Sequence, residues 1–156
     1  MRLFEGKVVV LGVTGSIAIY KILDLIPMLK NEGIDVEVVM TESARKLITP
    51  LPFQSLSGKP VHTDMFKPIR EYEIEHISLS RKADLILIAP ATANTIAKLA
   101  NGIADDLLSA TVLSSRSPVI IAPAMHHDMY ENPITKENIE RLKTVSYTHL
   151  TLPTKA

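Results

Sequence analysis

The sequence predicts an α/β fold with a parallel, doubly wound sheet. Short apolar runs alternate along the chain with segments whose apolar residues recur at helical spacing, and this alternation gives parallel strands with right-handed crossovers. The chain has 156 residues, of which 46% are hydrophobic, and this size and composition suit one domain with a buried core. No internal repeat indicates a different architecture.

The first part of the chain contains two predicted strands. Residues 7–13 are a β-branched run that ends near a glycine, which is typical of a buried strand. Ser16 precedes apolar residues at helical spacing, so we predict that it caps a helix, which ends at residues 31–33. Residues 35–40 form the second strand, and Thr41 begins a short helix.

The rest of the chain repeats this alternation. Prolines and a glycine between residues 50 and 72 predict short helices and irregular loops. A third strand at residues 84–89 is expected to break at Pro90, and a fourth is expected at residues 118–122. The predicted helices that flank these strands cover residues 76–82, 94–100, 105–114 and 134 to about 143.

The end of the chain differs from the rest. Residues 145–156 show no helical period and no glycine turn that would lead into a fifth core strand. We therefore interpret residues 1–144 as the folded domain and residues 145–156 as a non-native tail. A native edge strand is the alternative interpretation of this segment.

Charge and composition exclude several classes of protein. The formal net charge is zero and no basic stripe is present, so we expect no nucleic acid or membrane partner. No apolar run approaches the ~20 residues of a membrane helix, and residues 1–5 do not read as a signal peptide, so we expect a cytoplasmic protein. The absence of cysteine excludes disulfides and zinc-thiolate sites, and we expect no metal.

The first strand-to-helix turn, GVTGSIAIYK, predicts an anion site. It is neither a GxGxxG fingerprint, because the third glycine is missing, nor a P-loop. Gly12 and Gly15 allow close approach of the backbone, while Thr14 and Ser16 offer hydroxyls beside the free N–H groups of a helix start, which suit a phosphate. Thr41 follows the second strand and points to the same place. An ordinary capped turn is the alternative.

The segment DLILIAPATANTIAKLANGIADDLL, residues 84–108, predicts a ligand site at the end of the third strand. Ligands of open α/β sheets lie beyond the carboxyl ends of the strands. Thr92, Asn94 and Thr95 place short hydrogen-bonding side chains there, which suits a planar ligand. The alternative is that Thr92 only caps the next helix.

Three segments together, GVTGSIAIYK, IAPATANTIAKLANGIADDLL and PAMHHDMYENP, resemble the flavin-dependent cysteine decarboxylases. This family includes phosphopantothenoylcysteine decarboxylase and the peptidyl-cysteine decarboxylases of lantibiotic maturation, and the resemblance spans roughly residues 7–143. Within the family the chain is most similar to the decarboxylase half of the bifunctional coenzyme A biosynthesis protein, whose ligase half is absent here. The resemblance implies a flavodoxin-like (Rossmann-like) fold with three α/β/α layers, and FMN as the cofactor.

The resemblance also implies the reaction and the assembly. FMN oxidises a small-molecule cysteine conjugate at Cβ so that its carboxylate can leave as CO2. The cofactor carries out this oxidation, and the protein places the substrate and transfers protons. The implied conversion is 4'-phospho-N-pantothenoylcysteine to 4'-phosphopantetheine, and the implied assembly is a homotrimer or larger oligomer with FMN between subunits. The implied FMN-binding residues are Gly15, Ser16, Thr41, Pro90, Ala91, Thr92, Ala93, Asn94, Ala124 and Met125.

Two histidines match positions at which this family binds its substrate or transfers protons. His76, in HISL, matches the catalytic histidine, and histidine suits proton transfer near neutral pH; by residue type alone, a helix cap or surface residue is the alternative. His126 stands where the family usually has an asparagine that holds the substrate carboxylate. The family's proton donor is a cysteine on a lid beyond Lys143. Because this chain contains no cysteine, we expect it to be poor at the final reduction of the product.

Other interpretations stay open. A flavin prenyltransferase of related fold lacks the PAM-type segment found here. An FMN-binding regulatory or inactive homologue is opposed by His76 but left open by His126 and the missing lid. A nicotinamide-binding Rossmann domain is opposed by the absent GxGxxG and by Met40-Thr41, where an acid would end the second strand.

Overall fold

The sheet of the computed structural model is parallel throughout. The structure describes residues 3–65, 75–145 and 147–149, and in these residues the strand order is β2-β1-β3-β4-β5, with every neighbouring pair parallel. The strands are β1 (Val8–Val13), β2 (Asp35–Met40), β3 (Leu85–Ala91), β4 (Val119–Pro123) and β5 (Thr148–His149). This order confirms the doubly wound, flavodoxin-like fold, whose direction of winding changes between β1 and β3.

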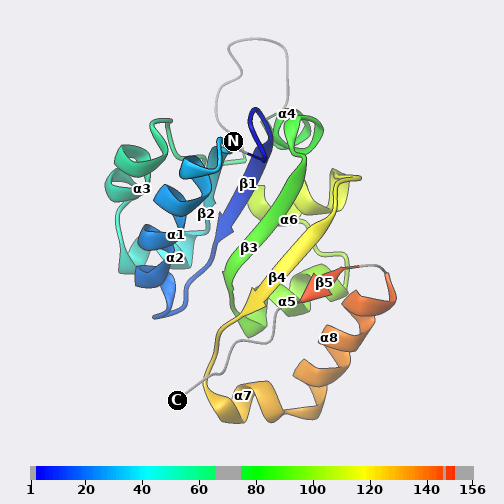
Figure 1. Ribbon diagram of the computed structural model, residues 1–156. Helices are drawn as coiled ribbons and strands as arrows, with labels where there is room; N and C mark the ends of the chain where they lie inside the picture. The colour runs from blue at the N-terminus through cyan, green and yellow to red at the C-terminus, as the bar shows by residue number, and fades with distance from the viewer. Residues whose placement is uncertain (1–2, 66–74, 146, 150–156) are drawn as a thin grey trace.

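Helices cover both faces of the sheet (Figure 1). One apolar core joins β1 and β2 to α1 and α3, and Ile19 and Phe53 are among its fully buried members. The other core joins the sheet to α4, α5, α6 and α8, through residues such as Leu79, Ile96 and Leu107. The helices are α1 (Ile19–Asn31), α2 (Glu42–Leu47), α3 (Pro50–Ser57), α4 (Glu75–Lys82), α5 (Ala93–Ala100), α6 (Leu107–Ser114), α7 (His127–Glu131) and α8 (Pro133–Thr144).

Pro90 does not end the third strand, so that prediction is wrong. β3 continues to Ala91, which pairs with Pro123 after a register shift between Ile88 and Ala91. Proline lacks an N–H and is tolerated in a strand where the ladder is irregular. The strand therefore carries the chain two residues further toward its carboxyl edge than the prediction did.

Ser16 does not cap α1, which corrects a second prediction. The helix begins at Ile19 with Ala18 as its N-cap residue. The Ser16 hydroxyl instead accepts a hydrogen bond from the Ala18 N–H (3.2 Å), and the Ser16 carbonyl accepts one from the Ile19 N–H (2.9 Å). Ser16 therefore lies in a separate turn between β1 and the helix, still directly after Gly15.

Residues 148–149 form a short edge strand beside β4. Thr148 pairs with Ile120 and His149 with Ile121, both in parallel register. This pairing corresponds to the alternative interpretation of the segment, while the non-native origin of residues 145–156 and the boundary at residue 144 stay predictions. The part of the segment beyond residue 149 lies outside the described residues.

Candidate functional site

Hydrogen bonds join the residues that follow the carboxyl ends of neighbouring strands. Between β1 and β2, the Thr41 N–H donates to the Val13 carbonyl oxygen at 3.1 Å. Between β1 and β3, the Thr14 hydroxyl donates to the Pro90 carbonyl oxygen, and the Thr92 N–H donates to Thr14 Oγ1 at 3.0 Å. The predicted residues at the ends of these strands therefore lie together.

The end of β4 joins the same group. The Ala124 N–H donates to the Ala91 carbonyl oxygen at 3.0 Å, and both alanines are buried. The ends of β1 to β4 thus form one continuous edge, which is where open α/β sheets bind ligands. We call the residues that follow these ends the strand-end cluster: Thr14, Gly15, Ser16, Thr41, Thr92, Ala93, Asn94, Ala124, Met125 and His126.

Thr14 has a different role from the predicted one. Its side chain is buried, with 1% of the residue exposed, and its single hydroxyl proton is donated to the Pro90 carbonyl oxygen. The hydroxyl oxygen of Thr14 in turn accepts from the Thr92 N–H. Thr14 is therefore a link between β1 and β3 and not a donor to a phosphate. No local pattern indicates this role, because the partners lie 76 and 78 residues away in the sequence.

Gly15 packs against the first turn of α2. A Cβ at position 15 would lie 2.5 Å from Ser43 Cβ and 3.1 Å from the Ser43 carbonyl carbon, so a side chain does not fit without movement. The Thr41 hydroxyl accepts from the Ala44 N–H at 3.2 Å and caps the same helix, as predicted. The structure therefore brings Gly15 and Ser16 together with the start of α2.

The Thr92 hydroxyl caps α5. It accepts from the Thr95 N–H at 3.2 Å and donates to Thr95 Oγ1 at 3.1 Å, so the alternative interpretation of Thr92 as a helix cap is correct for its side chain. Ala93 is the first residue of α5 and is half-buried, while Asn94 is exposed. The Asn94 amide carries both donors and an acceptor and is accessible at the end of β3.

His126 caps α7, a helix that is too short for periodicity to predict. Its Nδ1 accepts from the Asp128 N–H at 3.1 Å, and 58% of its side chain is exposed. Since an accepting ring nitrogen carries no proton, the neutral imidazole holds its proton on Nε2. His126 therefore presents an N–H donor at the end of β4, beside the half-buried Met125.

His76 lies apart from the strand-end cluster. It is the second residue of α4, and Figure 1 shows this helix at the opposite end of the sheet from α7. Its Nδ1 is buried, and no hydrogen-bond partner for it exists among the described residues. A single chain therefore does not bring His76 together with His126, in contrast to the other predicted site residues.

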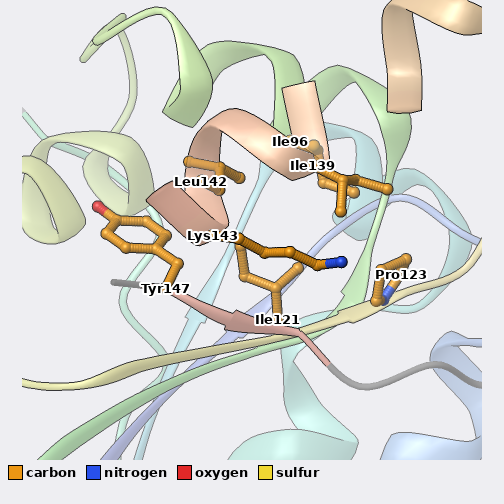
Figure 2. A pocket seen from close by; sticks show the side chains of 7 residues that line it. All are labelled: Ile96, Ile121, Pro123, Ile139, Leu142, Lys143 and Tyr147. Carbon is orange, nitrogen blue, oxygen red and sulfur yellow. The ribbon is translucent and has the colours of Figure 1, made fainter. Parts of the chain in front are cut away.

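Two hollows in the described structure contain no residue of the strand-end cluster. A wide one of about 490 Å³ lies between α4 and the end of α6, and its lining includes Arg81 and Arg116. A small one has a volume of about 10 Å³, roughly the size of one water molecule. Figure 2 shows the apolar side chains around the small one, together with Lys143, and its lining residues are Ile96, Ile121, Pro123, Ile139, Leu142, Lys143 and Tyr147.

Within residues 3–65, 75–145 and 147–149, no three His, Cys, Asp or Glu side chains are arranged to hold a metal ion. None of the helices in these ranges combines the length and apolar character that crossing a membrane requires.

Comparison with known proteins identifies relatives over nearly the whole chain. The Flavoprotein family model matches residues 2–155. The coenzyme A biosynthesis bifunctional protein CoaBC of Vibrio vulnificus (strain YJ016) is 47% identical over 142 residues, which is 91% of this chain and 35% of that protein. The chain therefore spans about a third of the length of the curated relatives it matches.

Solved structures give the same result. SpaF, an FMN-dependent cysteine decarboxylase, superposes with a TM-score of 0.92 and 32% identity, covering 97% of this chain and 87% of SpaF. A mutant PPC decarboxylase complexed with pantothenoylaminoethenethiol superposes with a TM-score of 0.79 and 28% identity, covering 92% of this chain and 81% of that chain.

Proposed function

The chain belongs to the Flavoprotein family, and from this premise we propose that it is an FMN-binding cysteine-conjugate decarboxylase domain. The proposed reaction converts 4'-phospho-N-pantothenoylcysteine to 4'-phosphopantetheine in coenzyme A biosynthesis. The observation that carries the proposal is the linked edge made by the ends of β1 to β4, which gathers the predicted cofactor residues from separate parts of the sequence.

The strand-end cluster fits FMN. Gly15 lies so close to Ser43 that a Cβ would not fit without movement, so the turn that precedes α1 packs directly on the start of α2, and N–H groups at the start of a helix suit an anion such as the FMN phosphate. Ser16 and Thr41 lie beside it. The residues that would surround the flavin ring are Pro90, Ala91, Thr92, Ala93, Asn94, Ala124 and Met125.

FMN, when bound, supplies the two-electron oxidation that prepares the cysteine conjugate for loss of CO2. The protein's own groups place the substrate and move protons. The Nε2–H of His126 is positioned by the Nδ1 contact with Asp128 N–H, and it is free to donate to the substrate carboxylate. His76 is the proposed proton-transfer residue, because its Nδ1 lacks a partner among the described residues.

We propose that a second copy of the chain completes each site, in a homotrimer or larger assembly. Two observations support this. The helix that carries His76 lies at the other end of the sheet from His126 within one chain (Figure 1). In addition, Ile17 and Tyr20 are 81% and 56% exposed next to the turn that holds Gly15 and Ser16, and apolar exposure of this kind often marks an interface.

The proposed protein is longer than this chain. Because the chain spans 35% of the bifunctional relative, we propose that a ligase domain follows the decarboxylase domain in the full protein, and that the whole acts in the cytoplasm. The cysteine-bearing lid of the family would belong to the same missing part, since the chain contains no cysteine.

The test combines a spectrum with a turnover assay. The purified protein should be yellow, with a visible flavin spectrum, and should release CO2 from phosphopantothenoylcysteine, whereas His76→Ala should keep the flavin and lose CO2 release. A yellow parent protein without turnover would favour an FMN-binding regulatory homologue, which the histidine at position 126 makes the second candidate. A colourless protein that takes up no FMN would contradict both.

A further inference from the structure

A cluster of charged side chains lies beside β2, at the edge of the sheet, outside the strand-end cluster. Its centre is Glu37, whose side chain is 5% exposed. The His62 Nε2 lies 2.8 Å from one Glu37 carboxylate oxygen, and the Lys82 Nζ and Lys59 Nζ lie 2.9 and 3.2 Å from the other. We call Glu37, Lys59, His62, Glu75 and Lys82 the charge cluster; Asp35 lies at its margin, 3.9 Å from Lys59.

His62 joins two carboxylates. Its backbone is fixed against β2, because its N–H donates to the Val38 carbonyl at 2.8 Å and its carbonyl accepts from the Met40 N–H at 3.0 Å. The second ring nitrogen, Nδ1, lies 2.5 Å from Glu75 Oε1. A neutral imidazole has only one N–H, so both carboxylate contacts are hydrogen bonds only when His62 is the imidazolium ion.

The surroundings of His62 favour that charged form. Burial alone would lower the pKa of His62, but the hydrogen bonds and charges of Glu37 and Glu75 outweigh burial and raise it above its usual value. The hydrogen bond from His62, helped by Lys82 and Lys59 and opposed by burial, lowers the pKa of Glu37 to about 2. The contacts therefore persist to a higher pH than they would around an ordinary histidine, and they weaken as pH rises through the raised pKa of His62.

These contacts fix both ends of α4. Glu75 is the first residue of this helix and pairs with His62, while Lys82 is its last residue and pairs with Glu37. Between them, Leu79 is buried in the core. His76 follows Glu75 directly, and its Nδ1 has no hydrogen-bond partner in the described chain. The place of the His76 ring is therefore set by the backbone of the first turn of α4.

We propose that His62 is a positioning residue, which holds the first turn of α4 through Glu75 so that His76 sits where proton transfer requires it. The proposal rests on the proposed function, because it assumes that His76 transfers the proton. A purely structural ion pair would affect stability alone, whereas a positioning pair also affects kcat and the order of one helical turn.

The main test compares Glu75→Gln with a matched control. Glu75→Gln keeps the shape of the side chain but removes the charge that pairs with His62, and we expect kcat for CO2 release to fall about tenfold, part of the 10²–10⁴-fold that a placed acid–base group supplies. KM and flavin content should stay within about twofold of the parent. Glu140→Gln, which removes an exposed pair with Lys143 (2.9 Å), should change none of these quantities.

Hydrogen exchange gives a readout that does not depend on activity. In the parent protein, protection of the amides of residues 79–82, which donate to the carbonyl groups of the first turn of α4, should fall as pH rises through the raised pKa of His62 and the imidazolium ion loses its proton. Glu75→Gln should lower this protection at pH values below the raised pKa of His62, to the level that the parent reaches only at higher pH. His62→Arg, whose charge is permanent and whose donors reach two carboxylates, should keep both protection and kcat and remove the pH dependence of the protection.

The failures of the two proposals are distinguishable. If the parent takes up no FMN, the proposed function fails, and the exchange experiment still reports on the first turn of α4. If the parent is active and Glu75→Gln keeps the parent kcat and the parent protection, the positioning role of His62 is refuted while the decarboxylase assignment stands. Equal losses in Glu75→Gln and Glu140→Gln would refute it as well.

Discussion

Thr14→Val tests whether the link between β1 and β3 builds the cofactor site. Valine has nearly the shape of threonine but removes the hydroxyl that donates to the Pro90 carbonyl and accepts from the Thr92 N–H. The buried carbonyl left without a partner costs about 1–3 kcal/mol, and the partly buried N–H about 0.5–1.5 kcal/mol. The free energy of unfolding should therefore fall by about 1.5–4.5 kcal/mol, a large part of the 5–15 kcal/mol typical of a domain.

Two assays measure the effect. Urea unfolding followed by circular dichroism gives the loss of stability, with an unchanged dependence on urea concentration if the native state stays compact. Fluorescence titration gives the FMN affinity, which we expect to fall at least about tenfold, equivalent to about 1.4 kcal/mol, because the ends of β1 and β3 are no longer tied. Thr14→Ser keeps the hydroxyl and should recover most of the FMN affinity.

Thr111→Val is the matched control. Thr111 is also fully buried, but its hydroxyl donates at 2.7 Å to the Leu107 carbonyl one helical turn back, an oxygen that the helix already supplies with a backbone partner. We expect a loss below about 1 kcal/mol and no change in FMN affinity. The reasoning is refuted if Thr14→Val and Thr111→Val lose equal stability and bind FMN equally well.

Three further changes give separate tests. Gly15→Ala should weaken FMN binding by about tenfold or more, because its Cβ would meet Ser43 Cβ at 2.5 Å; the added Ser43→Gly change should restore affinity in the same titration. The pKa of Glu37 is lowered from 4.5 to about 2, so its carboxylate stabilises the fold above about pH 4.5 and loses this contribution as pH falls toward 2. In urea unfolding, the free energy of unfolding of the parent should therefore fall by roughly 3 kcal/mol more over this pH range than that of Glu37→Gln. His126→Ala should raise KM for the cysteine conjugate about tenfold with unchanged flavin content, and His126→Asn should restore KM in the CO2-release assay; an unchanged KM in His126→Ala would remove this residue from the site.

Strands β1 to β4 could be predicted because each one is marked by a run of apolar, often β-branched, residues in the local sequence. The second strand was predicted with the observed bounds, since its β-branched run is followed at once by Thr41, which caps α2. The prediction that the third strand ends before Pro90 was wrong. The sequence does not reveal that Pro90 falls at a shift in the pairing of β3 with β4, where no backbone N–H is needed. The five-residue helix α7 was missed because it is shorter than two turns.

Residue types at the strand ends were predictable, but the partners of their hydroxyls were not. Thr92 and Thr41 each accept from a backbone N–H three residues later, a bond that their sequence context indicates. The Thr14 hydroxyl is bound by residues of another strand. Residue types therefore predict where a site is expected, while only the folded chain shows which polar groups remain for a ligand.

The charge cluster has one visible sign in the sequence, a glutamate within the apolar strand DVEVVM. A carboxylate at that place must be paired if it is buried, yet the sequence does not say with what, since His62, Glu75 and Lys82 follow 25 to 45 residues later. Buried ion pairs are often no more stabilising than apolar side chains of similar volume. Stability alone thus gives little reason for Glu37 to hold His62 and Lys82 at the edge of the sheet. Orientation of α4 gives a better reason. A pair with fixed geometry at each end of a helix determines the place of that helix more narrowly than apolar contact does, and the Nδ1 atom of His76 has no hydrogen-bond partner in the described chain that would hold the ring.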